Sequence, residues 1–546
     1  MNPFHGLDGD DQRKGWRIAL ITILVLGAGL GLRDPWPPDE PALALMAKTM
    51  ADSGEWLIPF LGGEPFAGHP PFAVWLMAAF YDTTGSLRLS FLLPSLLASL
   101  GTLWLVYDLA RQLWGARTGR LAAMALLCSF QFMLQAHRGQ VDAILMFWAT
   151  LALYGFLQYI LLENSRRWLQ VAGAAIGMGV LTKGVGYLPA LILLPWAWMR
   201  HQGWQALPAG RNLRQCWLAG LTALILVLAW ALPTLGFVSG ADDQALDRFR
   251  RELLINLAGG ADLLPGASDR AWWYLPLQAL LLWLPLTLLL PWKIRVWRDR
   301  LRARDPVIGL LLGYILLVLA FFSLLPGKHG VQLLIVLPAV ALLMAPYLGG
   351  LWWRPGVQRV SVACLWLASL CLLAVFFFSD EVLLWWHQQR PAADIPDLLW
   401  QFLGVLGTLG LAISVAMRGQ SRALGLPVFF FAGWLLLGFW AYPSLNTLRT
   451  PAPMMAAVEA RMAPEDQLAV LAWRPQIELF ARRPVRRLDR AGSEWETQAA
   501  AAQWLQQSSS HWLIGPLDDL ENLPMATEIH VLDIRHRVNW ALARAR

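Results

Sequence analysis

Residues 216–238 read CWLAGLTALILVLAWALPTLGFV, an apolar run without a single charged residue. A helix of about 20 apolar residues spans a bilayer, because all its backbone polar groups are then paired inside the helix. Similar runs recur along the chain, for example at residues 306–325 and 358–379. The sequence therefore predicts a polytopic integral membrane protein.

The overall composition agrees with this interpretation. Hydrophobic residues make up 57% of the chain and charged residues only 15%, whereas soluble domains carry about 25% charged residues. Many of the 31 tryptophans stand at the ends of apolar runs, as in Trp272-Trp273, where indole rings favour the headgroup level. The four cysteines show no zinc-like spacing and predict no disulfide framework. The net charge of +7 is spread over loops, which is not the pattern of a nucleic-acid-binding protein.

About thirteen apolar segments are long enough to be candidate spans. They are residues 16–32, 88–110, 119–134, 141–162, 168–182, 185–199, 216–238, 271–292, 306–325, 331–349, 358–379, 397–417 and 425–442. The first is followed by Arg33-Asp34-Pro35-Trp36 and not by a small-residue cleavage site, so we expect a retained span and not a signal peptide.

Basic residues set the orientation, because short cytoplasmic loops are enriched in Lys and Arg. With the N-terminus inside, alternate loops carry clusters such as Arg111 to Arg120, Arg166-Arg167 and Lys293 to Arg304, while the opposite loops are acidic or mixed. Thirteen spans then place the C-terminus outside.

Three segments outside the membrane are substantial. Residues 33–87 form a first outer loop, in which the apolar spacing from Leu43 to Met50 predicts a helix on the membrane interface. Residues 239–270 mix acidic and basic residues with turn signals and are predicted to form a mobile loop. In residues 443–546 the long apolar runs end. Strand-like segments at 468–473, 512–515 and 529–534 alternate there with helical ones at 453–462 and 493–507, which predicts a small extramembrane α/β domain after a membrane domain of residues 1–442.

Two adjacent acids, Asp39 and Glu40, stand just beyond the first span in the sequence PPDEP. Paired carboxylates beside a bilayer can act as general bases or metal ligands. They are equally common at solvated helix N-termini, where the backbone dipole favours negative charge. The pair alone does not decide between these roles.

The motifs around this pair are more informative about function than the pair itself. Asp39-Glu40 is followed by Gly54-Glu55-Trp56-Leu57-Ile58-Pro59, Gly63-Glu64-Pro65 and His69-Pro70-Pro71-Phe72. Further along come Arg138 with Asp142, Leu181-Thr182-Lys183-Gly184, Arg248-Phe249, Trp272-Trp273-Tyr274, and Phe321-Phe322-Ser323 with Lys328. In this order, over about residues 33–350, the chain resembles the polyprenyl-phosphate-sugar-dependent membrane glycosyltransferases, the superfamily of protein O-mannosyltransferases and lipid A aminoarabinose transferases. Each short element is weak, but their order is specific.

The resemblance implies a GT-C fold, with an all-α membrane domain of about 13 helices and a catalytic outer loop at 33–87. It also implies a donor sugar on a polyprenyl phosphate, undecaprenyl phosphate in the bacterial branch. The acceptor would be lipid A, a polysaccharide or a protein, at the periplasmic face of the inner membrane. No nucleic acid and no cofactor is expected.

Transfer breaks the bond between the anomeric carbon and the phosphate, so fixed cations should stabilise the departing lipid phosphate. Lys183, Lys328, Arg138 and Arg248 all fall in predicted outer loops, although ordinary interfacial placement would also explain each. Asp39 is the candidate general base for an acceptor hydroxyl. For an acceptor phosphate, which is already anionic, it would orient groups or stabilise positive charge on the sugar.

Asp142 is the second candidate catalytic residue, and its spacing from Arg138 allows an ion pair on one helix face. Glu40 and His69 complete the predicted substrate-binding set. His69 departs from the family pattern, because the family has Lys there and His is only partly protonated near neutral pH. Gly68 replaces a Glu that helps hold a metal in lipid A aminoarabinose transferases, and no partner His is evident near Arg248-Phe249. We therefore predict no metal of that kind, and a weaker case for the aminoarabinose specificity.

Two other classes of function remain at this point. A transporter or flippase for lipid-linked sugars would show internal repeats and charges inside spans, neither of which is evident here. A non-catalytic scaffold of the same fold is conceivable because of the changes at Gly68 and His69. Paired carboxylates of glycosidase type are a further reading of Asp39 and Asp142.

Overall fold

The structure, a computed structural model, describes residues 9–163, 165–208, 210–239, 244–258, 270–351, 354–389, 397–488, 494–523, 528–535 and 538–545. Within these residues, seven helical segments are long and apolar enough to cross a membrane. They are Leu87–Trp114, Val141–Leu162, Leu213–Phe237, Pro306–Leu324, Pro355–Phe377, Asp397–Ala416 and Ser421–Arg449. The protein is thus an integral membrane protein with a helical membrane domain, as predicted, while the count of thirteen spans stays a prediction.

The first half of the membrane domain contains α1 (Gly9–Leu26), α4 (Leu87–Ser90), α5 (Leu93–Trp114), α6 (Ala116–Leu127), α7 (Phe130–Ala136), α8 (Val141–Leu157), η1 (Gln158–Leu162), α9 (Arg166–Thr182), η2 (Gly184–Ile192), α10 (Leu193–His201), η3 (Leu213–Cys216) and α11 (Trp217–Ser239). The second half contains α13 (Tyr274–Leu282), η5 (Leu286–Trp292), α14 (Ile294–Arg302), α15 (Pro306–Leu324), η6 (Gly330–Ile335), α16 (Leu337–Leu351), α17 (Pro355–Phe377), α18 (Ser379–Gln389), α19 (Asp397–Ala416), η7 (Gly419–Leu424), α20 (Gly425–Leu436), η8 (Leu437–Ala441) and α21 (Tyr442–Arg449).

Several predicted straight spans are broken instead. The segment 119–134 is divided between α6 and α7, which meet at 71°, and the segment 271–292 between α13 and η5, which meet at 106°. Proline explains part of this, since Pro285 stands at the second break and lacks a backbone donor. The two breaks support each other, because the amide of Phe130 donates to the carbonyl of Leu284 at 2.9 Å. Non-helical backbone is tolerated in a membrane only where such partners exist.

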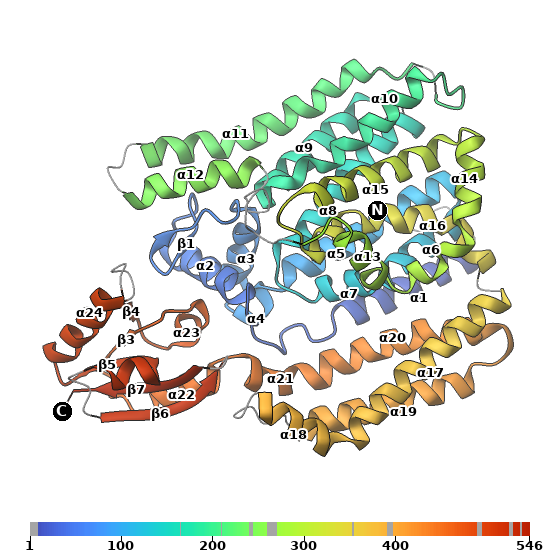
Figure 1. The fold of residues 1–546 in the computed structure, drawn as a ribbon. Helices are drawn as coiled ribbons and strands as arrows, with labels where there is room; N and C mark the ends of the chain where they lie inside the picture. The colour runs from blue at the N-terminus through green and yellow to red at the C-terminus, as the bar shows by residue number, and fades with distance from the viewer. Residues whose placement is uncertain are drawn as a thin grey trace.

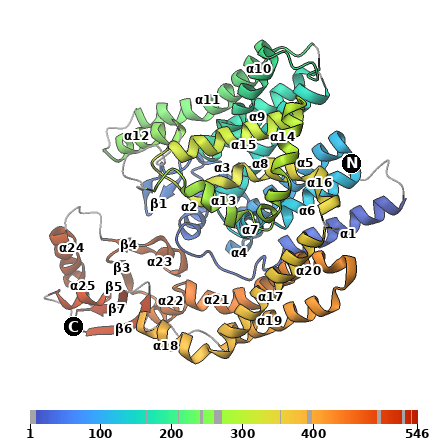
Figure 2. The same cartoon turned by 45° about the vertical axis from the view of Figure 1, so that its right-hand side comes forward.

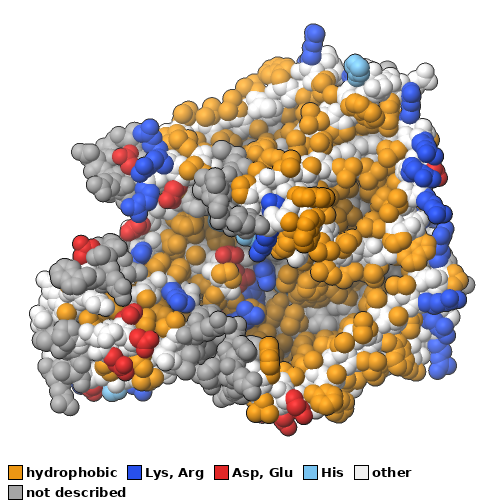
Figure 3. Space-filling model, in the orientation of Figure 1, with side chains coloured by type: hydrophobic (Ala, Val, Ile, Leu, Met, Phe, Trp, Pro, Cys, Tyr) orange, Lys and Arg blue, Asp and Glu red, His pale blue; other side chains and the backbone are white. Residues whose placement is uncertain are grey.

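The bundle has a clear polarity. In Figure 1 the long helices run roughly side by side, and the segment 33–87, helix α12 (Gln244–Ala258) and the C-terminal sheet all lie at one end. Figure 3 shows a column of Lys and Arg side chains along the opposite end. The basic end agrees with the cytoplasmic loops predicted from charge.

The outer segment 33–87 folds into α2 (Glu40–Ser53), a short hairpin of β1 (Phe60–Leu61) and β2 (Glu64–Pro65), and α3 (Phe72–Thr84). The apolar face of α2 was predicted to lie on the membrane interface, and this is wrong. Leu43, Met46 and Met50 are buried in a cluster shared with Met77 of α3. The same helical spacing fits either environment, so sequence alone could not decide which surface covers it.

The predicted loop 239–270 is also different where it is described. Residues 244–258 form α12, in which Phe249 and Leu253 are 2% and 1% exposed and pack with Trp230 of α11 and Ile58 of the outer segment. This i, i+4 apolar pair anchors the helix. Residues 240–243 and 259–269 of that predicted loop lie outside the described residues.

The C-terminal region forms a five-stranded sheet in the order β4-β3-β5-β7-β6, with β3 (Gln467–Val470) parallel to β4 (Val485–Arg487) and β5 (His511–Pro516). β7 (Val538–Arg544) runs antiparallel to β5 and to β6 (Glu528–Arg535). Its helices are α22 (Ala452–Glu459), α23 (Pro475–Phe480), α24 (Glu494–Gln507) and α25 (Leu517–Glu521). Separate apolar clusters cover the two sheet faces, one with residues of α22 and one with residues of α24. The small α/β fold predicted for this region is confirmed.

This sheet region rests on the outer segment (Figures 1 and 2). Leu479 of α23 is 6% exposed within the cluster of α2 and α3. Beside it, the indole of Trp473 lies so close to Gly62 that a Cβ there would stand 2.8 Å from the ring, and Gly62 has a φ of +60°. Gly62 therefore allows the C-terminal region to approach the hairpin of the outer segment.

Candidate active site

A buried ion pair fixes the start of α2. The two guanidinium nitrogens of Arg33 each donate to one carboxylate oxygen of Glu40 at 2.5 Å, and Arg33 is 2% exposed. Glu40 also accepts from the amides of Trp36 at 2.8 Å and Gly139 at 2.9 Å. Every oxygen of Glu40 is thus occupied, so its geometry suits a residue that holds the loop, and the proposed contact with substrate has no support from these bonds.

Gly139 is required for this arrangement. A Cβ at position 139 would lie 2.4 Å from the ring of Phe91 and 2.7 Å from its carbonyl oxygen. Only glycine lets the chain between α7 and α8 approach closely enough for its amide to reach Glu40. The ion pair therefore ties the outer segment to the start of α8.

A second tie comes from the far end of the chain. The side-chain oxygen of Asn446, on α21, accepts from the amide of Asp34 and from the indole of Trp36, both at 3.0 Å. Its amide nitrogen donates to the carbonyl of Leu32, also at 3.0 Å. Asn446 therefore connects the end of the membrane domain to the residues immediately before Asp39.

Asp39 differs from its neighbour Glu40. It stands at the N-cap of α2, is exposed, and makes no side-chain capping bond. One carboxylate oxygen, Oδ2, accepts from the side-chain amide of Gln140 at 2.7 Å. Gln140 is the N-cap of α8, whose first turn contains Asp142. The two predicted catalytic carboxylates thus belong to adjacent helix starts that Gln140 links.

Asp142 pairs with Lys183. The ammonium of Lys183 lies 3.2 Å from Asp142 Oδ1, and the two side chains are 19% and 13% exposed. Lys183 stands where α9 ends and η2 turns back, and a Cβ on Gly186 would lie only 2.1 Å from the backbone of Gly179. This close backbone crossing explains why Gly appears on both sides of Lys183.

Asp142 and Lys183 line a small pocket together with Phe322 of α15 and Gln332 of η6. Lys328 lies just before η6, is 7% exposed, and donates through its ammonium to the carbonyl of Leu325 at 2.6 Å. Arg270 donates to the carbonyl of Lys328 at 2.8 Å. Phe322 of the Phe-Phe-Ser motif and Lys183, which are far apart in sequence, therefore line one small pocket.

The remaining predicted residues are less central. Arg138 is exposed and precedes α8, which begins at Val141, so the predicted pairing of Arg138 with Asp142 on one helix face is wrong. Arg248 is exposed on α12, whose next residue, Phe249, is the buried anchor. His69 is half-buried beside the ring of Phe66 at a centroid distance of 6.3 Å.

Metal ligation has no structural support in the described part of the chain, where no group of three or more His, Cys, Asp or Glu side chains is arranged to hold an ion. The expectation of a metal-free site stays a prediction.

Three residues of the site were not predicted from the sequence. Arg33, Gln140 and Asn446 act by holding the carboxylates or the loop, and each has at least one partner more than 100 positions away in sequence. Only Arg33 offered a hint, since a cation next to the outer end of a span is unusual.

Known proteins resemble this chain along most of its length. Residues 68–232 match the family described as dolichyl-phosphate-mannose-protein mannosyltransferase. The undecaprenyl phosphate-alpha-4-amino-4-deoxy-L-arabinose arabinosyl transferase of Pseudomonas paraeruginosa is 31% identical over 442 residues, covering 78% of this chain and 75% of the relative. The transferase of the same name from Aeromonas salmonicida is 28% identical over 465 residues, covering 81% and 75%.

Solved structures agree on the fold. ArnT from Cupriavidus metallidurans in the apo state superposes with a TM-score of 0.74 at 19% identity, covering 97% of this chain and 98% of that one. The same protein bound to undecaprenyl phosphate gives a TM-score of 0.72 at 18% identity. These similarities confirm the predicted membrane glycosyltransferase architecture with its small C-terminal sheet.

Proposed function

Because this chain belongs to the undecaprenyl phosphate-alpha-4-amino-4-deoxy-L-arabinose arabinosyl transferase family, we propose that it moves that amino sugar from undecaprenyl phosphate to a phosphate group of lipid A. It is a glycosyltransferase that uses a lipid-linked donor. The proposal concerns which sugar is transferred, which acceptor receives it and which residues take part. We further propose that the reaction takes place at the periplasmic face of the bacterial inner membrane.

One observation supports the proposal most strongly: Asp142 and Lys183 form an ion pair 3.2 Å apart that lines a small pocket together with Phe322 and Gln332. A departing polyprenyl phosphate gains negative charge as the bond from the anomeric carbon to its oxygen breaks. A cation that is already fixed before the reaction stabilises that charge without reorganisation. Lys183 is positioned for this role by Asp142 and by the glycine crossing behind it.

The acceptor oxygen forms the new bond to the anomeric carbon as the donor phosphate leaves. A lipid A phosphate is already anionic near neutral pH, so no proton need be removed from it. Asp39, which is exposed and accepts a hydrogen bond from Gln140 on Oδ2, then orients the sugar or stabilises positive charge that develops on its ring. For a hydroxyl acceptor the same carboxylate is the candidate base.

The test is made in cells. A deletion strain is complemented with the intact protein, with Asp39→Asn or with Lys183→Gln, and lipid A is analysed by mass spectrometry. Loss of an amino-pentose mass on deletion, its return with the intact protein, and a decrease of at least about 100-fold for either variant support the proposal.

Asp82→Asn is the matched control, because Asp82 is an exposed aspartate of α3 in the same outer segment. It should restore full modification. Full restoration by Asp39→Asn would show that the site is wrongly assigned. Modification of glycoprotein in place of lipid A would show that the acceptor is wrong.

A further inference from the structure

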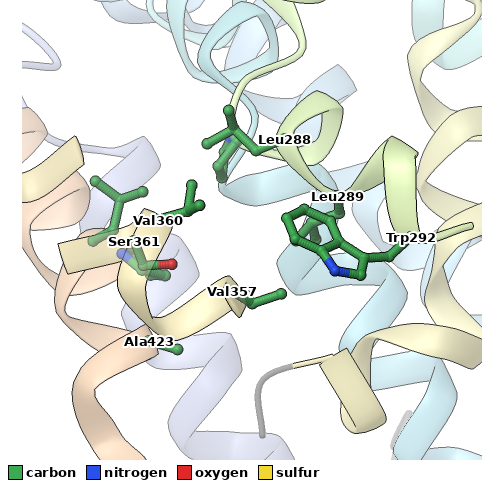
Figure 4. A pocket seen from close by; sticks show the side chains of 10 residues that line it. Leu288, Leu289, Trp292, Val357, Val360, Ser361 and Ala423 are labelled. Carbon is green, nitrogen blue, oxygen red and sulfur yellow. The ribbon is translucent and has the colours of Figure 1, made fainter. Parts of the chain in front are cut away.

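A second site is suggested at the end of the bundle opposite the candidate active site. There η5 and the start of α17 form the walls of an apolar crevice. In Figure 4, Leu289 and Trp292 of η5 face Val357 and Val360 of α17, and Ala423 of η7 closes one end. The crevice belongs to none of the elements that form the pocket around Lys183.

Exposed apolar side chains lie next to the crevice in sequence. Leu424 and Val428, which neighbour the lining residues Ala423 and Pro427 in sequence, are 47% and 40% exposed. Apolar side chains with this exposure in a membrane domain face acyl chains. Since lipid tails are as apolar as these walls, the crevice selects for shape but does not by itself distinguish one lipid from another.

A buried cation lies directly beside it. Lys293 follows the lining residue Trp292, is 6% exposed, and has its ammonium 5.0 Å from the centre of the Tyr347 ring. Among the residues that the structure describes, Lys293 forms no ion pair with an acid. A cation over an aromatic ring is partly stabilised, but its charge is not neutralised.

A second cation adds to the first. Arg354 is the N-cap of α17, one turn before the lining residue Val357. Burial, followed by the charge of Arg354, lowers the pKa of Lys293 below its ordinary value. An anion placed between the two side chains would relieve this repulsion.

We propose that this crevice and Lys293 form a binding site for an anionic glycerophospholipid, with one acyl chain between η5 and α17 and its phosphate between Lys293 and Arg354. Basic pockets between membrane helices at the positively charged end of a bundle suit such headgroups. A phospholipid fits better than the donor lipid, because the donor phosphate belongs at the opposite end, beside Lys183. The site is independent of the transfer reaction proposed above.

The experiment uses the full-length protein, purified and delipidated in detergent. Phosphatidylglycerol or phosphatidylcholine is added, bound lipid is counted by native mass spectrometry, and thermal unfolding is followed by tryptophan fluorescence. Phosphatidylglycerol should bind and raise the unfolding midpoint by several degrees, since a ligand of the native state stabilises it. Phosphatidylcholine should do neither. Lys293→Gln should weaken phosphatidylglycerol binding by about five-fold and remove most of the thermal shift.

Arg298→Gln is the matched control, since Arg298 is an exposed cation of the neighbouring helix α14 with 60% of its side chain accessible. It should leave binding unchanged, and an equal loss for both variants would overturn the proposal in favour of general surface charge. Val360→Phe fills the crevice without changing charge and should also weaken binding. The proposal would also be overturned if phosphatidylglycerol bound equally well to Lys293→Gln and Val360→Phe. A rise in the unfolding midpoint that depends on Lys293 and is produced by undecaprenyl phosphate alone would overturn it as well.

Discussion

Arg33 and Lys293, two of the buried cations in the described residues, lie at opposite ends of this membrane protein and differ in their partners. Arg33, at the outer end, is 2% exposed and donates to both oxygens of Glu40. Lys293, at the basic end, is 6% exposed, lies over the ring of Tyr347 and is influenced by the charge of Arg354. Glu40 neutralises the charge of Arg33, whereas no acid of the described chain pairs with Lys293.

The difference separates two uses of charge in a membrane domain. A buried pair in which both carboxylate oxygens accept from the guanidinium fixes geometry, and at Arg33 that geometry places Asp39 at the start of α2. A buried cation without an acid is costly unless an outside anion completes it. Burial alone therefore does not identify a ligand site, but burial combined with missing neutralisation does.

The strongest test of the comparison removes Arg33. Arg33→Gln leaves Glu40 buried without its cation, which should destabilise the protein by about 3–5 kcal/mol and abolish sugar transfer. Thermal unfolding in detergent and lipid A mass spectrometry measure the two effects. Arg88→Gln is the control, because Arg88 pairs with Asp34 in the same segment but has 53% of its side chain exposed. That pair should contribute only about 0–1 kcal/mol. Equal effects of the two variants would contradict the special role given to the buried pair.

A smaller effect is expected at Asn446. Asn446→Ala removes the bonds to Asp34, Trp36 and Leu32 while leaving the ion pair intact. At about 1 kcal/mol per bond, the free energy of unfolding should decrease by about 1–3 kcal/mol. If Asn446 positions the outer segment, kcat should decrease more than KM increases. Thr447→Ala, an exposed change one residue away, should alter neither quantity; a loss of stability with unchanged kcat would reduce Asn446 to a structural contact.

The third prediction has the opposite sign. In delipidated detergent, Lys293→Gln should leave the free energy of unfolding unchanged or raise it by about 1 kcal/mol, because it removes a buried charge that no acid of the described chain neutralises. The same substitution should be unfavourable once phosphatidylglycerol is present. Comparing the unfolding midpoints with and without that lipid checks both signs. If Lys293→Gln lowered the unfolding midpoint without lipid as much as Arg33→Gln does, Lys293 would be a structural cation like Arg33.

The smallest effect should come from an ion pair in water. The hydrogen bond from Arg544, with its charge and then that of His530, lowers the pKa of Glu528 in the C-terminal sheet. A carboxylate with a lowered pKa stabilises the fold above its unfolded pKa, and this contribution is lost as the pH falls through the folded value. Arg544→Gln should therefore reduce the difference in unfolding midpoint between neutral and acidic pH, slightly and only at low salt. A change that persists at 1 M salt would indicate a role beyond this exposed pair.

The sequence predicted the membrane fold and the C-terminal sheet because both depend on local patterns. Apolar runs of bilayer length and alternating strand and helix segments are visible in any window of the chain. The breaks within spans were missed because they depend on which carbonyl finds a partner elsewhere, as Leu284 does in Phe130. The apolar face of α2 was assigned to the wrong surface for a similar reason. The residues of α2 alone do not show that α3 packs against this face.

The site divides in the same way. The motifs that contain Asp39, Asp142, Lys183 and Lys328 were recognised from their order, and the structure brings Asp142 and Lys183 together around one pocket. The pairing within the site was not predictable. Spacing favoured Arg138 for Asp142, whereas the start of α8 at Val141 leaves Arg138 off the helix and the partner is Lys183, 41 positions later. The prediction from spacing was wrong because the contact between Lys183 and Asp142 is tertiary.

The tie between Asn446 and the outer segment has a consequence for how the protein is made. The bonded positions are 410 and 412 residues apart. At about 5–20 residues per second, a ribosome needs roughly 20–80 s to pass from one to the other. During that time the loop with Asp39 has been synthesised but lacks its last anchor. The chain thus acquires a finished outer segment only when nearly all its helices have been inserted, so biosynthesis itself delays the assembly of the candidate site until the bundle is almost complete.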